Sequence, residues 1–118
     1  MADVHAQESA LNELIAAGKG MEGFEKFYAD DIVMQENLEA PTHGKDENRK
    51  REQAFMAMVE EFHGAKLLGS AVNGDLSYSE WEFDMKFKGQ PRRPMTEVAA
   101  RRWKDGKIVH ERFYYKMA

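Results

Sequence analysis

Two short turn signals in the second half of the chain limit its fold most strongly. Asn73–Gly74 and Asp105–Gly106 are each flanked by segments in which apolar and polar residues alternate. Asn-Gly and Asp-Gly favour the two-residue turns that join neighbouring antiparallel strands. A further turn, "GQPRRP" (89–94), separates the two hairpins. The sequence therefore predicts a four-stranded antiparallel meander over about residues 65–116.

The residues before this meander have helical spacing. One helix is predicted up to Ala17, with Gly18 as its C-cap, and a short second helix over 21–28. "ADDIVMQE" (29–36) leads into a strand, and Asp46–Phe62 is the clearest helix, with Asp46 as its N-cap. Helices packed on one face of an antiparallel sheet make an α+β fold.

Length and charge exclude several classes of protein. The 118 residues predict one domain, 1–118. The net charge of −4, with acids and bases interleaved, argues against binding to nucleic acid, which needs clustered cations. The absence of cysteine suits a reducing compartment, and the apolar runs are shorter than a membrane span. We therefore expect a cytoplasmic protein with no membrane partner.

Motifs for cofactors and metals are weak. "GKGMEG" (18–23) matches a dinucleotide-binding pattern in letters, but a helix precedes it and no βαβ unit surrounds it. The four histidines stand on separate elements, without the two-histidine spacing of a zinc site. We expect neither a cofactor nor a metal.

Alternation assigns side chains to the two faces of the sheet. Trp81, Phe83 and Met85 share one apolar face of their strand. A two-residue turn at Asp105–Gly106 pairs Arg102 with Val109, Ala100 with Glu111 and Val98 with Phe113, and these residues, with Thr96 and Tyr115, form the face predicted to meet the helices. The opposite face would carry Glu97, Arg101, Trp103, Ile108, His110, Arg112 and Tyr114. A bulge at the turn would invert this relation between the two strands.

Glu111 is a polar residue on the predicted inner face. His110 precedes it and points to the other face, so the two cannot act as a catalytic pair. Burial among apolar neighbours would raise the pKa of Glu111 and make it a proton carrier. The alternative is that Glu111 meets an arginine or water. The sequence leaves both open.

Several segments together resemble a known family. "FEKFYADDIVMQEN", "GKDENRKREQAF", "FDMKFKGQP" and "WKDGKIVHERFYY" are similar to the nuclear transport factor 2-like superfamily, and within it to the steroid delta-isomerase and SnoaL-like branches. The resemblance implies a cone-shaped α+β barrel, in which a curved, mostly antiparallel sheet wraps about three helices. It also implies a deep apolar pocket and homodimers made by sheet faces.

The resemblance also implies roles for individual residues. The isomerase base, which abstracts a proton beside a carbonyl, falls at Glu36. The tyrosine donor of the isomerases falls at Asn12, their partner acid at about Val98, and the acid of SnoaL-like cyclases near Lys116, so these three positions depart from the family pattern. The expected substrate-binding residues are Trp81, Phe83, Met85, Phe113, Tyr115, Val98, Phe55 and Tyr28.

These observations favour a protein with a pocket for a small hydrophobic molecule. Glu36 is the candidate general base of isomerase- or cyclase-like chemistry, with Glu111 and Asn12 as its polar partners. The alternative is a non-catalytic ligand-binding or dimerisation module of the same fold. A third hypothesis is a dimer through the face that carries Trp103, His110 and Arg112. Whether the protein is an enzyme stays open.

Overall fold

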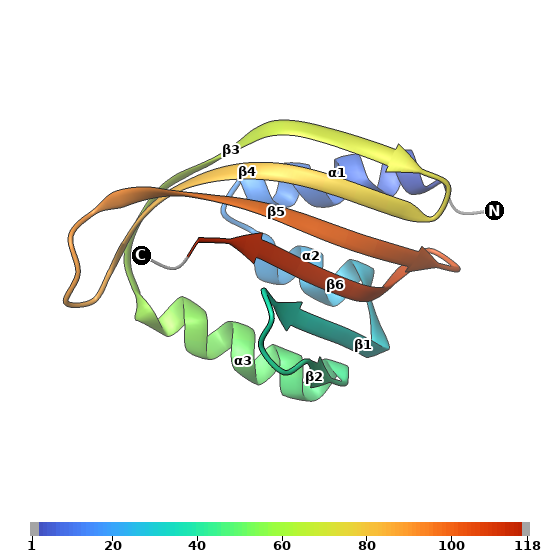
Figure 1. The fold of residues 1–118 in the computed structure, drawn as a ribbon, viewed down its shortest axis with the longest axis horizontal. Helices are drawn as coiled ribbons and strands as arrows, with labels where there is room; N and C mark the ends of the chain where they lie inside the picture. The colour runs from blue at the N-terminus through green and yellow to red at the C-terminus, as the bar shows by residue number, and fades with distance from the viewer. Residues whose placement is uncertain (1–2, 117–118) are drawn as a thin grey trace.

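The helices and strands follow the predicted order. The computed structural model describes residues 3–116. Its elements, shown in Figure 1, are α1 (Val4–Ala16), α2 (Gly20–Phe27), β1 (Tyr28–Glu36), β2 (Thr42–His43), α3 (Lys45–Met58), β3 (Val59–Asn73), β4 (Leu76–Phe87), β5 (Arg93–Lys104) and β6 (Lys107–Tyr115). Asp3 caps α1 by accepting a hydrogen bond from the Ala6 N–H at 3.3 Å, and Gly18 leaves the helix with a positive φ of 77°.

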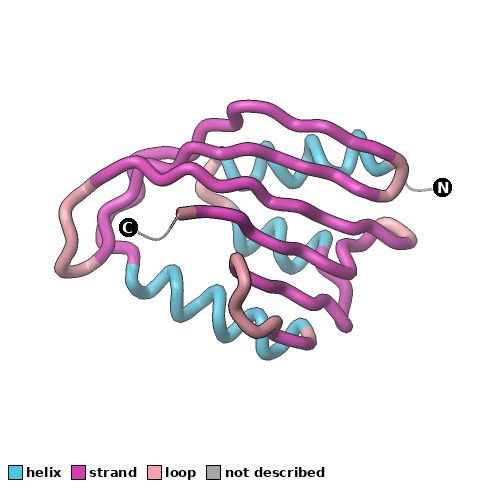
Figure 2. The backbone as a smooth tube through the Cα atoms, viewed as in Figure 1, coloured by secondary structure: helices cyan, strands magenta, loops and turns pink. Residues whose placement is uncertain are grey.

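The strands form one six-stranded sheet in the order β2-β1-β6-β5-β4-β3. β1 and β6 are parallel, and the other neighbours are antiparallel. The sheet is curved and open, with β2 and β3 at its two edges (Figure 2). This confirms the predicted α+β fold, with three helices and a mostly antiparallel sheet, and the meander is β3–β6.

Three predicted boundaries are wrong by a few residues. The helix predicted to reach Phe62 ends at Met58, because Val59 already pairs with Phe87 of β4. Gly44, not Asp46, occupies the N-cap position of this helix. In the first hairpin Asn73 pairs with Leu76, so the turn consists of residues 74 and 75. The pairing of Val59 with Phe87 is a tertiary contact, and it overrides the helical pattern at the C-terminal end of α3.

The predicted faces of the last hairpin are inverted. Asp105 and Gly106 form the two-residue turn, both with positive φ (50° and 81°), as a type I′ turn requires. A bulge then shifts the register between Arg102 and Trp103, so that Arg101 pairs with Glu111. The inner face therefore carries Glu97, Ala99, Arg101 and Trp103 of β5, while Val98, Ala100 and Arg102 lie on the outer face.

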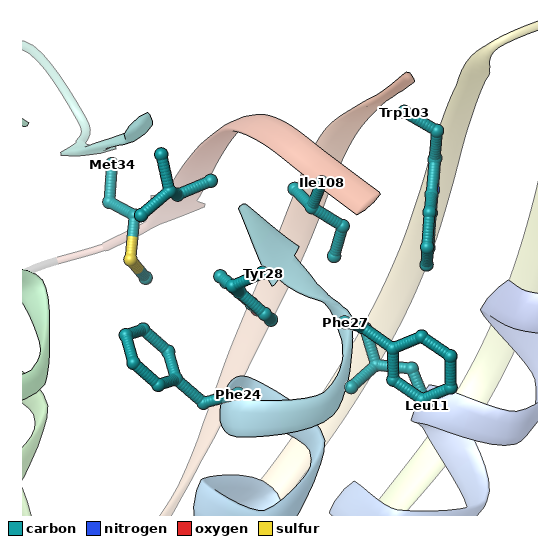
Figure 3. Packing of buried hydrophobic residues seen from close by; sticks show 8 residues of the cluster. Leu11, Phe24, Phe27, Tyr28, Met34, Trp103 and Ile108 are labelled. Carbon is teal, nitrogen blue, oxygen red and sulfur yellow. The ribbon is translucent and has the colours of Figure 1, made fainter. Parts of the chain in front are cut away.

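The hydrophobic core lies between α1, α2 and the inner face of the sheet. Figure 3 shows its side chains converging from the helices and from β1, β5 and β6. The cluster consists of Leu11, Phe24, Phe27, Tyr28, Ile32, Met34, Trp103 and Ile108. Trp103 and Ile108 are 3% and 0% exposed, which corrects their predicted outward position.

Candidate functional site

Three rows of side chains cross the inner face of the sheet. Strand register places Ser77, Arg101 and Glu111 in the first row, Ser79, Ala99 and Phe113 in the second row, and Trp81, Glu97 and Tyr115 in the third row. β1 extends the first row with Met34 and the second row with Glu36. Charged side chains are therefore built into the interior of the fold.

Arg101 is the centre of a buried network of charges, here called the Arg101 network. Its Nε donates to Glu111 Oε2 at 2.7 Å, and its Nη1 donates to Glu8 Oε2 at 2.9 Å. Arg101, Glu8 and Glu111 are only 3%, 1% and 0% exposed. Burial disfavours the charged guanidinium, but the carboxylates and Tyr28 outweigh it and raise the pKa of Arg101.

Neutral groups complete the Arg101 network. Tyr28 donates to both oxygens of Glu111 at 2.6 Å, and the Asn12 amide donates to Ser79 Oγ at 2.9 Å. Ser77 and Ser79 donate to Glu8, and the Trp103 indole donates to Ser77 Oγ at 2.9 Å. Burial, followed by the charge of Glu111, raises the pKa of Tyr28 well above its ordinary value. The network ties α1 and β1 to the meander.

Three predicted site residues thus belong to this network. Glu111 meets an arginine, which is one of the two alternatives that the sequence left open. Asn12 is 4% exposed and also accepts a hydrogen bond from Arg101 at 3.2 Å. The polar atoms of Asn12, Glu111 and Tyr28 are therefore engaged within the protein, and their roles toward a ligand stay predictions.

A second group of carboxyls lies where α3 meets the end of β1. Arg51 Nη1 is 3.2 Å from Glu36 Oε2, and Arg51 Nη2 is 3.1 Å from Glu52 Oε1. The side chains of Arg51, Glu36 and Glu52 are 25%, 31% and 23% exposed, so solvent reaches this group. Glu97 of the third row is close enough to feel the charges of Glu52 and Glu36.

Two carboxyls of this group titrate near neutral pH. Burial raises the pKa of Glu52 from 4.5 to about 7, and the charges of Glu111 and Glu36 add to this against the opposing charge of Arg51. Burial also raises the pKa of Glu97 to about 8, with further contributions from Glu111, Glu52 and Glu36 against Arg101. At pH 7, Glu97 is mostly protonated and Glu52 carries a proton about half of the time.

Glu36, the predicted base, lies at the end of β1 beside Tyr115. Burial and the charge of Glu36 raise the pKa of Tyr115 to about 12, which keeps this hydroxyl protonated. Glu36 also lines a surface hollow of about 200 Å³, together with Met34, Glu39, Ala40, Thr42 and Arg51. Solvent therefore reaches the carboxylate of Glu36. This carboxylate already pairs with Arg51, and that ion pair opposes the transfer of a substrate proton to it.

The aromatic and apolar residues predicted to bind substrate, here called the aromatic wall, lie in several different environments. Trp81 is 1% exposed and its ring stacks on that of Phe83, with the centroids 5.7 Å apart. Met85 is 7% exposed, and Phe55 packs edge-on against Phe87. Phe113 and Tyr115 are half-buried on the inner face, whereas Val98 faces outward, which corrects its predicted place in a pocket.

A second hollow lies away from this aromatic wall. It measures about 300 Å³ and runs between α1 and β3, with Leu67, Ser70 and Val72 on the strand side and His5, Glu8, Ser9, Asn12, Glu13 and Ala16 on the helix side. The wall residues Trp81, Phe83 and Met85 line neither this hollow nor the one at Glu36. A deep apolar pocket therefore stays a prediction.

Four charged side chains of the two groups described above were not predicted from the sequence as inner or site residues. Arg101 and Glu97 were placed on the outer face because the assignment assumed a hairpin without a bulge, and the bulge that was named as an alternative is present after Arg102. Glu8 and Glu52 lie on helices, where acidic residues are usually solvated. A signal for Glu97 was its place one residue before Val98, the position where the resemblance had put an acid.

Residues 3–116 contain no group of three histidine, cysteine or acidic side chains arranged to hold a metal ion. Within the same residues, no helix is both long and apolar enough to cross a membrane.

Comparisons with known proteins agree with this architecture. The profile of the SnoaL-like domain matches residues 6–115. A candidate SnoaL-like polyketide cyclase from Mesorhizobium loti is 34% identical, with a TM-score of 0.88 over 97% of this chain and 100% of that chain. A comparison with curated protein sequences gives no significant match.

More distant solved structures share the fold alone. A protein with a ketosteroid isomerase-like fold from Catenulispora acidiphila, in complex with trimethylamine, is 17% identical, with a TM-score of 0.77 over 94% of this chain and 85% of that chain. A protein with a cystatin-like fold from Xanthomonas campestris is 16% identical, with a TM-score of 0.84 over 98% of this chain and 92% of that chain. With its helices, its curved sheet and a match over nearly its whole length, the chain belongs to the SnoaL-like family.

Proposed function

We propose that this protein binds a small, mostly apolar carbonyl compound at the third row and moves a proton beside the carbonyl. The observation that carries the proposal is the pair Glu52 and Glu97, two carboxyls from different elements with pKa values of about 7 and about 8. Groups that titrate near the working pH are the most effective general acids and bases. The candidate polyketide cyclase at 34% identity supports this choice, because polyketides carry carbonyl groups.

The two carboxyls would have different roles. Glu97, protonated at pH 7, donates a hydrogen bond to the carbonyl oxygen, where negative charge develops. Glu52 in its ionised form takes the proton from the neighbouring carbon, since its partial exposure lets a substrate approach. Glu36 is a second candidate base, and it is held by Arg51 at 3.2 Å.

The experiment is proton exchange on a simple ketone. In D₂O at pD 7, the protein should accelerate exchange of the C2 protons of 1-tetralone, followed by ¹H NMR. Glu52→Gln should reduce the rate by about 10²-fold or more, because a general base contributes about 10²–10⁴. Glu47→Gln, on the exposed side of α3, is the matched control and should leave the rate unchanged.

The Glu36→Gln variant distinguishes between the two candidate bases, Glu52 and Glu36. If it abolishes exchange while Glu52→Gln does not, the base is Glu36. Saturable binding of 1-tetralone without any accelerated exchange would instead support the non-catalytic alternative, a ligand-binding module of the same fold.

We also propose a homodimer through the outer face of the sheet. This face carries the exposed rings of Tyr78 and Tyr114 (44% and 46%) around the half-buried Val98 and Ala100. Its charges are of both signs, with Glu80 on β4 and Arg112 on β6, which suits a surface that packs on a copy of itself.

Light scattering tests this dimer. Tyr78→Glu should shift the protein from dimer to monomer at micromolar concentration, because it would place a charge in the apolar centre of the interface. Leu38→Glu, 90% exposed in the loop before β2, is the control and should leave the dimer intact. A wild-type monomer under these conditions would refute the proposed interface.

A further inference from the structure

The indole N–H of Trp81 is a buried donor with no acceptor in the described part of the chain. Trp81 is 1% exposed, and its Nε1 has no hydrogen-bond partner among residues 3–116. Buried polar groups are almost always paired, because an unpaired one loses its hydrogen bonds to water without replacement. Such a donor in the interior therefore points to an acceptor outside the chain.

The surroundings of Trp81 indicate which kind of acceptor fits. Trp81 lies next to Glu97 in the third row, and Glu97 lies next to Tyr115. An anion would meet the carboxylate of Glu36 and the partly ionised Glu52 at this end of the interior, and both would repel it. A cation would gain nothing from an N–H donor. A neutral oxygen, as in a ketone or ester, satisfies the indole without bringing a charge.

Trp103 provides an internal comparison. It lies on the same inner face, and its indole N–H is satisfied by Ser77 Oγ at 2.9 Å. The indole N–H of Trp103 is therefore hydrogen-bonded, whereas that of Trp81 has no partner among the described residues. An experiment that detects each indole N–H separately can measure this difference.

We propose that Trp81 Nε1–H donates a hydrogen bond to a neutral carbonyl oxygen of the ligand and makes the site select ketones over hydrocarbons of the same shape. This inference rests on the proposed function, since it concerns the same site. It assigns to Trp81 a polar role in addition to its apolar ring. Phe83, which is stacked on Trp81, is only half-buried.

The test uses 1-tetralone and tetralin, which have the same ring system with and without the carbonyl group. In ¹H–¹⁵N spectra of the wild-type protein, 1-tetralone should shift the Trp81 indole signal downfield, whereas tetralin should not. The Trp103 indole signal should stay in place with both compounds. Trp81→Phe assigns the signals, because one of the two indole peaks disappears.

Affinity gives a second measurement. Trp81→Phe keeps an aromatic ring but removes the donor, so its affinity for 1-tetralone should fall about tenfold while its affinity for tetralin stays the same. If 1-tetralone binds in the interior and leaves the Trp81 indole signal unmoved, this inference is overturned and the proposed function stands. If neither compound perturbs the third row, both are overturned. The wild-type spectra decide the matter even where the variant folds poorly.

Discussion

Arg101→Met should lower the free energy of unfolding by about 3–5 kcal/mol at pH 7. The substitution keeps much of the side-chain volume but leaves Glu8 and Glu111 in the interior without their cation. Removing one partner of a buried ion pair costs about this much, because the remaining charge has neither solvent nor counterion. Urea denaturation followed by circular dichroism measures the change.

Two further variants show whether charge is the cause. Arg102→Met, on the exposed outer face of the same strand, should change the stability by less than about 0.5 kcal/mol. The combination of Arg101→Met with Glu8→Gln and Glu111→Gln should recover much of the loss, since no uncompensated charge remains. An Arg101→Met protein as stable as the Arg102→Met protein would mean that the Arg101 network contributes little.

Glu97→Gln should make the protein more stable at pH 8.5 by a few kcal/mol, on the order of 3. In the unfolded chain this carboxyl loses its proton near its ordinary pKa of 4.5, whereas in the folded protein it keeps the proton up to about pH 8. Between these values the folded state binds more protons, so stability falls as pH rises. The contribution is complete below pH 4.5 and is lost as pH rises through 8. Glutamine resembles the protonated acid and does not titrate.

Thermal unfolding between pH 5 and pH 9 measures this difference. The two proteins should be similar in stability near pH 5 and diverge above it, with the wild type falling more steeply. Glu80→Gln, on the exposed face of β4, should follow the wild-type curve at every pH. Parallel curves for the wild type and Glu97→Gln would show that Glu97 ionises normally, and the acid–base proposal would lose its main support.

The fold was largely predictable because its signals are local. Asp105–Gly106 takes the two positive φ angles that its turn needs, and the alternation from Trp81 to Phe87 matches the inner face of β4. Gly18 follows the C-cap residue Ala17 and has a positive φ, so the end of α1 lies one residue from its predicted position. Each of these features depends on residues that are close in the chain, so the sequence pattern contains the information.

The candidate site was only partly predictable because a single extra residue decides it. The bulge between β5 and β6 moves Arg101 and Glu97 inward and Val98 outward, and nothing in the turn sequence requires that bulge. A one-residue shift exchanges the two faces of a strand, so the predicted set of inner residues on β5 changed as a whole. The places of Glu36 at the end of β1 and of Tyr115 on the inner face of β6 were predicted correctly, because neither depended on β5.

The sequence by itself thus determined the order of elements, the meander, the helices on one face and the family resemblance. Only the tertiary structure decided which charges meet in the interior. Glu8 lies 93 residues before Arg101, and Glu52 and Glu97 are also far apart in the chain. Arg101 and Glu111 belong to one hairpin, but they face each other only because of its bulged register. The physical reason is that a pKa and an ion pair depend on burial and on neighbours in space, and those neighbours are set by strand register rather than by the local pattern.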